Sequence, residues 1–234
     1  MPSNDHQLSH VGRRRFLQFL GAGATLAFPG WVLGKNSLWM PEELPVTPTQ
    51  TEGPFYPETS IEKQLFSDTD LIQKLGGHEY AKGQPVAITG TVRDRSGRPL
   101  PGAVVEIWQA CATGRYNHSR DNRNPALLDN NFQFWGRAIT AGDGKYFFKT
   151  IIPGKYPGRT GRHIHYRIDS EGFKRLSTQS YFADFGEDNM RDGIYKRLSP
   201  KERKLVTVEF DKPKSDDGKT NPWRGNFDIV LANR

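Results

Sequence analysis

The segment from residue 156 to residue 167, YPGRTGRHIHYR, holds two tyrosines, three arginines and two histidines. In a β-strand, side chains two positions apart point to the same face, so His163 and His165 project side by side if this segment is a strand. A His-x-His pair on a strand offers two imidazoles to one metal ion. The same spacing also occurs in histidines that face solvent or are satisfied locally, so the pair alone leaves both roles open.

Further ligands for this pair are few. A third imidazole would have to come from His118, and no carboxylate is a clear candidate beside the pair. Two tyrosines remain, namely Tyr156, between Pro153 and Pro157, and Tyr116 in TGRYNH, directly after a predicted strand. For each of them the alternative is an ordinary packed aromatic ring whose hydroxyl is hydrogen-bonded.

Two phenolates and two imidazoles would select a particular metal. Tyrosinate is a hard, anionic donor that suits Fe(III). Because free tyrosine has a pKa of about 10, only a strongly Lewis-acidic ion holds it deprotonated at neutral pH. Two phenolate charges would keep the iron ferric and leave it able to bind an anionic bidentate ligand such as a catecholate.

The elements that must position these side chains have the pattern of a β-sandwich. Alternating apolar and polar residues predict strands at 86–94, 103–110, 163–169, 175–183, 204–210 and 226–231, with a further strand after the turn at 143–144. Seven or so short strands separated by turn signals are typical of such a fold. Helix is predicted only around 188–205, where Ser199 precedes Pro200 as a cap, and in a short segment near 68–75.

The composition agrees with an all-β fold that contains little helix. The chain has 234 residues, of which 35% are hydrophobic and 25% charged, with 24 glycines and 16 prolines. This composition suits a turn-rich globular protein better than a helical bundle. We predict an export signal at 1–34, an extended N-terminal arm at 35–85 and a β-sandwich domain at 86–234.

The first residues have the pattern of an export signal. GRRRFLQFL at 12–20 places three arginines before a mildly apolar stretch rich in small residues. This order is typical of a bacterial signal, and the arginine pair followed by Phe-Leu resembles the twin-arginine type. A membrane anchor is the alternative, which Pro29 and the nearby glycines disfavour. We therefore expect export to the periplasm and no integral membrane domain.

The formal net charge of +7 is spread over the whole length of the chain. No basic run is interleaved with aromatic residues, so we expect no nucleic-acid partner. A positive field would help to gather a small anionic substrate. Cys111 is the only cysteine, so no intrachain disulfide can form.

Several segments, taken together and in this order, resemble one enzyme family. GTVRDRSGRPLPGAVVEIWQACATGRY, YPGRTGRHIHYRI and STQSYFADF resemble the intradiol ring-cleavage dioxygenases, in particular the protocatechuate 3,4-dioxygenase type. TEGPFYP resembles the N-terminal segment of that family, and the resemblance covers roughly residues 48–232. It implies a β-sandwich that holds non-haem Fe(III) through two tyrosines and two histidines, here Tyr116, Tyr156, His163 and His165.

The resemblance also implies roles for other residues. Tyr156 would leave the iron when a catechol binds and take up a substrate proton, and Gln179 matches a glutamine of the family. The family usually has an arginine three residues before the first ligand histidine, where this chain has Thr160. We assign that role to Arg159, which with Gln179 would stabilise developing negative charge, and we keep Arg162 as the alternate, beside the substrate. The segment that lines the substrate pocket matches Gly53, Pro54 and Tyr56.

The implied reaction is intradiol cleavage of a catechol-type aromatic by O₂, which gives a cis,cis-muconate-type dicarboxylic acid. The partners are then a small aromatic diol and O₂, and the resemblance leaves a homo-oligomer and a hetero-oligomer open. A competing interpretation is a transthyretin-like or carboxypeptidase-regulatory-like binding module, which GTVRDRSGRPLPGAVVEIW also resembles. A zinc hydrolase, for which no helper carboxylate is evident beside the histidines, and a catalytically silent subunit also compete with the dioxygenase.

Overall fold

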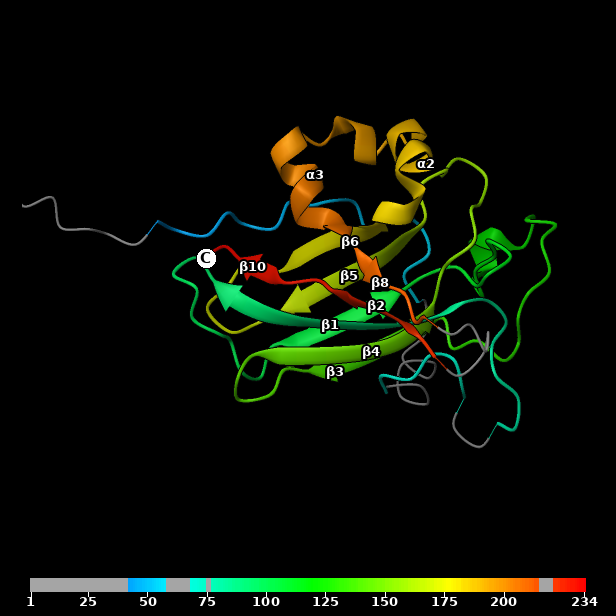
Figure 1. The fold of residues 1–234 in the computed structure, drawn as a ribbon, viewed down its shortest axis with the longest axis horizontal. Coiled ribbons are helices and arrows are strands. Elements are labelled where there is room, and N and C mark those ends of the chain that lie inside the picture. The colour runs from blue at the N-terminus through cyan, green and yellow to red at the C-terminus, as the bar shows by residue number, and fades with distance from the viewer. Residues whose placement is uncertain (1–41, 58–67, 75–76, 215–220) are drawn as a thin grey trace, which may run out of the picture. The chain divides into compact units, whose positions relative to one another are not determined.

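A computed structural model of the chain describes residues 42–57, 68–74, 77–214 and 221–234. The predicted export signal and the start of the predicted arm lie outside these residues. The described residues form two β-sheets, which the ribbon in Figure 1 shows as stacked layers. Within the same ranges, no helix combines the length and the apolar character that a membrane crossing requires.

The first sheet is built around one long strand. Strand β1 (Pro85–Asp94) pairs antiparallel with β4 (Lys145–Ile151) along one edge. Along its other edge it pairs parallel first with β9 (Trp223–Asn226) and then with β10 (Ile229–Leu231). The short strand β8 (Phe210–Asp211) extends the sheet beside β9.

The second sheet carries the histidine pair. Its strand order is β3 (Trp135–Ile139), β2 (Val104–Trp108), β5 (His163–Asp169), β6 (Leu176–Phe182) and β7 (Thr207–Val208). Pairing is antiparallel from β3 to β6, and β7 joins β6 in parallel. The predicted strand of the histidines, 163–169, therefore forms with its predicted bounds.

The hydrophobic core lies between the two sheets. Ile88 and Phe148 from the first sheet and Ile107, Ile164 and Tyr166 from the second are each 0% exposed. Burying a large apolar side chain of this kind contributes roughly 1.5–3 kcal/mol. Because Ile164 and Tyr166 of β5 face this core, the alternate side chains of the same strand face the outer side of the sheet.

The predicted sandwich with an extended arm and little helix is confirmed. The helical segments of the described chain are short: η1 (Ser119–Asp121), η2 (Ala183–Phe185), α2 (Gly186–Arg191), η3 (Tyr195–Arg197) and α3 (Pro200–Val206). The cap predicted at Ser199 is present, because its hydroxyl accepts from the Glu202 amide at 3.3 Å while the Glu202 carboxylate accepts from the Ser199 amide at 2.8 Å. Figure 1 shows α2 and α3 together on the β6 side of the sandwich.

Two secondary-structure predictions are wrong. Residues 68–74 contain no helix, because their backbone bonds go to strands: the Leu71 amide donates to Lys149 O at 2.8 Å, and the Lys149 amide donates to Thr69 O at 2.8 Å. Asp70 also accepts from the Ile72 amide, a local bond that competes with helix formation. The predicted strand at 204–210 is split, since α3 continues to Val206 before β7 begins.

The N-terminal arm runs along the sheet without forming a strand. The Leu44 amide donates to Arg95 O at 2.8 Å, and the Gln50 amide donates to Ser177 O at 2.8 Å. The side chain of Gln50 continues this attachment by donating to Gln179 O at 3.0 Å. The arm therefore covers part of the edge of β6 and brings residues 51–57 toward the outer face of the second sheet.

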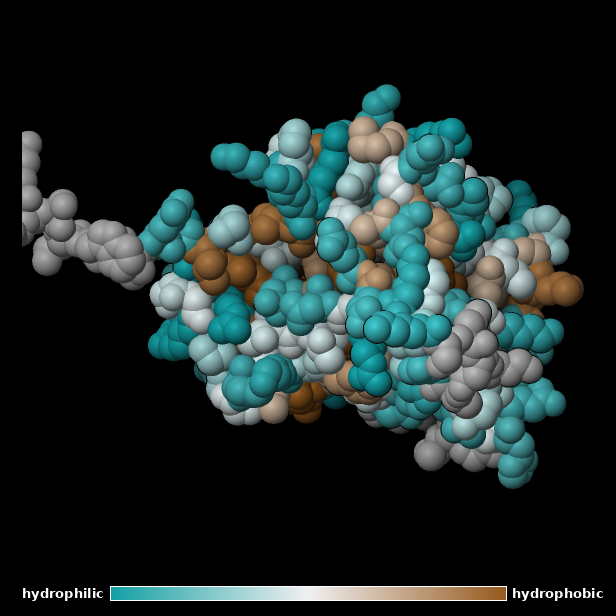
Figure 2. All heavy atoms as spheres, viewed as in Figure 1, coloured by the Kyte–Doolittle hydropathy of each residue, from teal (hydrophilic) through white to brown (hydrophobic). Residues whose placement is uncertain are grey.

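The face drawn in Figure 2 is mainly hydrophilic, with small separate apolar areas. Large apolar side chains that are exposed in the described part of the chain come from different elements: Tyr80, Leu127, Ile139, Phe147 and Met190. Single exposed residues of this kind are normal on a folded domain.

Candidate metal centre

A cross-strand row on the outer face of the second sheet holds one of the predicted ligands. His165 of β5 lies opposite Gln179 of β6 and Trp108 of β2, and Trp108 lies opposite Trp135 of β3. The Trp108 and His165 rings are stacked, with centroids 4.9 Å apart and an interplanar angle of 10°. Packing of this kind fixes the orientation of the His165 imidazole, which is 1% exposed.

The two tyrosines come from turns that touch through glycine. Gly114 has φ +86°, and a Cβ at this position would lie 1.9 Å from Lys155 O. A Cβ on Gly154 would lie 2.2 Å from the Gly114 amide nitrogen. Only glycine permits this backbone approach, which places Tyr116 and Tyr156, each two residues beyond one of the glycines, with ring centroids 5.3 Å apart.

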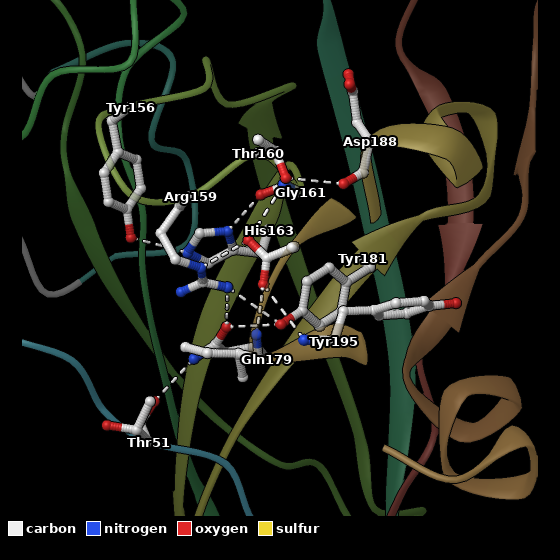
Figure 3. Close-up of polar contacts among 12 residues, drawn as sticks. Thr51, Tyr156, Arg159, Thr160, Gly161, His163, Gln179, Tyr181, Asp188 and Tyr195 are labelled. Atoms are coloured by element: carbon white, nitrogen blue, oxygen red, sulfur yellow. Dashed lines mark hydrogen bonds and ion pairs between the residues drawn. The ribbon is translucent and has the colours of Figure 1, made fainter. Parts of the chain in front are cut away.

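The structure brings the four predicted ligands together. The Tyr156 hydroxyl lies 3.1 Å from Nε2 of His163, and the ring centroids of His163 and His165 are 4.8 Å apart. Tyr116 joins the group through its contact with Tyr156. Figure 3 shows the Tyr156 hydroxyl directed at the His163 ring.

Hydrogen bonding sets the tautomer of His163. Its Nδ1 lies 2.7 Å from Gly161 O, and because a carbonyl oxygen only accepts, Nδ1 carries the hydrogen. The Nε2 lone pair therefore faces the Tyr156 hydroxyl, and an Nδ1 bonded to a carbonyl is the arrangement that metal-binding histidines adopt. Burial, followed by the charge of Arg159, lowers the pKa of His163, and burial, followed by His163, lowers the pKa of His165. Both imidazoles are therefore neutral at neutral pH.

The two tyrosine hydroxyls differ in their contacts, because that of Tyr156 lies against Nε2 of His163. The Tyr116 hydroxyl is buried and makes no hydrogen bond of normal geometry in the described structure. Burial, followed by the neighbouring Tyr156, raises the pKa of Tyr116 well above 10. Burial also raises the pKa of Tyr156, and the charge of Arg159 partly offsets this effect. An ion that binds here must be Lewis acidic enough to displace phenol protons.

This donor set fits Fe(III). Two hard phenolate oxygens with two neutral imidazole nitrogens match the preference of ferric iron. The described residues contain no group of three or more His, Cys, Asp or Glu that could hold a metal. A metal ion at the histidine pair would need other donors, and the two tyrosines are the oxygen donors that lie beside the pair.

Arg159 is held beside this centre by a network that Figure 3 draws. Its Nη2 donates to Gln179 Oε1 at 2.7 Å and to the Tyr181 hydroxyl at 3.1 Å, and its Nε donates to the Asp192 carboxylate at 2.8 Å. Burial opposes the charge, but the bond to Asp192 and the nearby tyrosines outweigh it and raise the pKa of Arg159. A permanent positive charge thus lies close to His163 and Tyr156.

Both the oxygen and the nitrogen of the Gln179 side-chain amide are hydrogen-bonded. Its Oε1 accepts from Arg159 and from Tyr181, the latter at 2.9 Å, while its Nε2 donates to Thr51 O at 2.8 Å. These bonds orient the arginine and attach the N-terminal arm. The contacts of Arg162 lie elsewhere: its Nη1 donates to Pro153 O at 2.6 Å and its guanidinium lies over the Phe185 ring. Of the two arginines, Arg159 is the one that lies beside His163 (Figure 3).

The arm residues take different positions around the centre. A Cβ on Gly53 would lie 3.5 Å from Cε1 of His165, so the arm passes close to that histidine, while Pro54 is exposed. The Tyr56 hydroxyl donates to the Glu106 carboxylate at 2.7 Å, and its ring lies edge-on against Trp108 at 5.0 Å. Tyr56 therefore packs behind the His165 side of the site.

Sequence reasoning missed Phe55, Asp192 and Tyr181. The Phe55 ring stacks on Tyr116 with centroids 4.5 Å apart and meets Tyr156 edge-on at 5.8 Å. A pocket of about 50 Å³ opens beyond this pair, lined mainly by aromatic side chains that include Phe132, Phe134 and Trp135. The alternation of β6 was a signal for Tyr181, which lies opposite His163, but the sequence has no comparable signal for Asp192.

Comparison with known proteins identifies the family of the chain. A family model described as "Dioxygenase" matches residues 51–233. Curated relatives with intradiol ring-cleaving activities accompany it, so the chain belongs to the intradiol ring-cleavage dioxygenase family.

Within that family, the chain is 34% identical over 175 residues to the protocatechuate 3,4-dioxygenase beta chain of Burkholderia cepacia, covering 71% of this chain and 72% of the relative. It is 31% identical over 202 residues to the hydroxyquinol 1,2-dioxygenase of Nocardioides simplex, covering 77% of this chain and 62% of the relative. Its match to a catechol 1,2-dioxygenase of Acinetobacter lwoffii spans 57% of this chain and 45% of that protein.

Solved structures share the fold. The dioxygenase domain of a dioxygenase and carbohydrate-binding protein fusion from Streptomyces sp. SirexAA-E superposes with a TM-score of 0.60 at 28% identity, covering 81% of this chain and 100% of that domain. An intradiol ring-cleavage dioxygenase from Tetranychus urticae gives a TM-score of 0.61 at 22% identity, covering 80% of this chain and 94% of that chain, a likeness of fold alone.

Proposed function

We propose that this protein cleaves a catechol-type aromatic between its two hydroxylated carbons, using O₂ and a non-haem Fe(III) held by Tyr116, Tyr156, His163 and His165. The single observation that carries the proposal is the convergence of these four side chains, with the Tyr156 hydroxyl 3.1 Å from Nε2 of His163. Both oxygen atoms of O₂ enter the product, a cis,cis-muconate-type dicarboxylic acid, so the reaction needs no external reductant.

Ferric iron held by Tyr116, Tyr156, His163 and His165 would supply Lewis acidity that makes a catecholate ring reactive toward O₂. The remaining work falls to side chains of this protein. Tyr156 is half-buried whereas Tyr116 is almost fully buried, so Tyr156 is the ligand that can move. As a phenolate it accepts a proton from a catechol hydroxyl, which is general base catalysis by a former ligand.

Arg159 supplies positive charge where negative charge develops on the reacting oxygens. Its guanidinium is held in advance by Gln179 and Asp192, so it does not have to reorganise during the reaction. Phe55 covers the Tyr116 ring and, with the arm, restricts the entry of water. Trp108 keeps the His165 ring in one orientation throughout.

We infer a substrate of the protocatechuate type, an anionic catechol. The relative that supports this choice is the protocatechuate 3,4-dioxygenase beta chain, and the net charge of +7 would attract such an anion. Catechol and hydroxyquinol are the substrates that other relatives suggest. Oxygen uptake and ring-opened product, measured with all three diols, discriminate among them.

The proposal is tested with iron-loaded protein. Tyrosinate bound to Fe(III) has a visible charge-transfer band, so the protein should be red to purple and should consume one O₂ per diol. Tyr156→Phe should retain iron and lose ring cleavage. As the matched control, Tyr146→Phe removes a buried hydroxyl that bonds Phe227 O in the core, and it should keep both colour and turnover. Stoichiometric ferric iron in a colourless protein would refute the ligand set. A protein that binds no iron and cleaves no diol would favour the binding module without catalysis.

We also propose that the chain is exported through a twin-arginine-type signal at residues 1–34. The support is the arginine run at 13–15 followed by the mildly apolar, glycine-rich stretch. Replacing Arg13 to Arg15 with lysine should leave the protein in the cytoplasm of an expressing bacterium. Delivery of that variant to the periplasm at the rate of the unaltered chain would exclude this route.

A further inference from the structure

We infer that Asp192 is a positioning residue that sets the orientation of Arg159 at the reaction centre, an inference that rests on the proposed function. Asp192 lies outside every segment that resembles the family motifs. It is separated from Arg159 by 33 residues, yet its Oδ2 accepts from Arg159 Nε at 2.8 Å. The Asp192 side chain is 0% exposed and that of Arg159 is 11% exposed, so this ion pair is almost entirely shielded from water.

The carboxylate of Asp192 is fixed on both oxygens. Besides Arg159, its Oδ2 accepts from the Gly161 amide at 3.2 Å. Its Oδ1 accepts from the Ile194 amide at 3.0 Å and from the Tyr195 amide at 3.3 Å, which anchors it at the start of η3. A carboxylate held by backbone donors on one side is a rigid acceptor for the guanidinium on the other.

The same carboxylate links Arg159 to a predicted ligand. Gly161, whose amide Asp192 binds, is the residue whose carbonyl accepts from Nδ1 of His163. One buried side chain thus holds both the arginine and the backbone that orients the imidazole. Gln179 and Tyr181 hold only Nη2 of the guanidinium, so without Asp192 the Nε edge would be free to rotate.

Three variants test this role: Asp192→Asn, Arg159→Gln and the double variant. The side-chain amide of D192N places either an NH₂ group or a weaker, neutral acceptor against Nε of Arg159, so the guanidinium should turn away. Loss of a supporting partner of this kind lowers activity by about 10- to 100-fold, and we expect kcat to fall more than KM because the charge acts in the transition state. D192N should keep its iron and its visible band, with at most a small shift of the band, because the carbonyl of Gly161 still accepts from His163 Nδ1.

The double variant separates positioning from a general structural role. If Asp192 acts through Arg159, D192N adds no further loss of kcat once Arg159 is glutamine. The melting temperature of the double variant should also exceed that of R159Q, which leaves a buried carboxylate unpaired. The inference would be overturned if the two single losses of kcat multiplied in the double variant, or if the two losses of melting temperature added. It would also be overturned if the kcat of D192N stayed within twofold of wild type, or if D192N lost the visible band.

Asp188→Asn is the matched control, since it makes the same chemical change on the neighbouring helix α2. Its carboxylate faces Lys155 at 3.1 Å, away from Arg159, and activity should stay within twofold of wild type. If D192N does not fold, the double variant can still be studied, because it has no unpaired buried charge. Its kcat and melting temperature, compared with those of R159Q, then decide whether Asp192 acts through Arg159. A wild-type protein that cleaves no diol would refute the proposed function, whereas the cycle of melting temperatures would still decide whether Asp192 and Arg159 are coupled.

Discussion

Gly114→Ala should separate the two tyrosines without touching any ligand. A methyl group at this position would lie 1.9 Å from Lys155 O and 2.7 Å from the Lys155 carbonyl carbon. Both atoms are backbone of the turn that carries Tyr156, so no side chain can rotate away to relieve the overlap. The turn itself must move, and Tyr156 must move with it.

The magnitude follows from two costs. Alanine at φ +86° costs about 1–2 kcal/mol because its Cβ crowds the backbone. Overpacking a tight contact adds about 1–3 kcal/mol. The total of about 2–5 kcal/mol corresponds to a fall of roughly 4–20 °C in melting temperature for a chain of this size.

Gly102→Ala is the matched control. Gly102 has φ +75° but no heavy atom within 4 Å of the position its Cβ would take, so it carries only the conformational cost. Calorimetry and the visible spectrum of iron-loaded protein are the assays. We expect G114A to lose at least twice the stability that G102A loses, together with a weakened charge-transfer band. Equal stabilities and spectra in the two variants would refute the reasoning.

Three further predictions concern the surroundings of the centre. Phe55→Ala removes the ring stacked on Tyr116, a contact worth about 0.5–1.5 kcal/mol, so iron should bind about 2- to 12-fold more weakly in a competition titration with a chelator. Arg162→Gln loses the bond to Pro153 O and the contact with Phe185, so chemical denaturation should show a loss of about 1–3 kcal/mol while kcat changes less than about threefold. Burial alone would raise the pKa of Asp192, but the bonds from Arg159 outweigh it and lower this pKa below 3.8. The stability that the Asp192 carboxylate contributes is therefore complete above its unfolded pKa and is lost as pH falls through the lower folded pKa. Urea unfolding between about pH 5 and pH 2.5 should show up to about 1.4 kcal/mol more loss per pH unit in wild type than in D192N.

The sandwich and its histidine strand could be predicted because their signals are local. Alternation from residue 163 to residue 169 predicted both the strand bounds and the shared face of the two imidazoles. Strand β3 was missed because Gly136 interrupts it and Ile139, an apolar residue, is 62% exposed. The segment at 68–74 was misassigned because its backbone pairs with residues more than sixty positions away. No local pattern encodes a pairing of that range.

The network around Arg159 shows a second limit of sequence reasoning. The family pattern left Arg159 and Arg162 undecided, since both flank Thr160. The choice depends on where the acceptors lie: Arg159 meets Gln179 and Asp192, whereas Arg162 meets Pro153 O and the Phe185 ring. Acceptors that the chain supplies 20 and 33 residues later can be identified only after folding.

Gln179 joins the two parts of the site that the sequence presents as separate. Its amide oxygen holds Arg159, and its amide nitrogen holds Thr51 O at 2.8 Å, at the start of the segment that resembles the pocket lining. The same arm carries Phe55 onto the Tyr116 ring. A displacement of the arm would therefore affect Arg159 through the Gln179 amide and the predicted ligand Tyr116 through its contact with Phe55. This coupling explains why an arm that forms no strand is nevertheless bound so closely to β6, since it fixes both the charge and the cover of the centre.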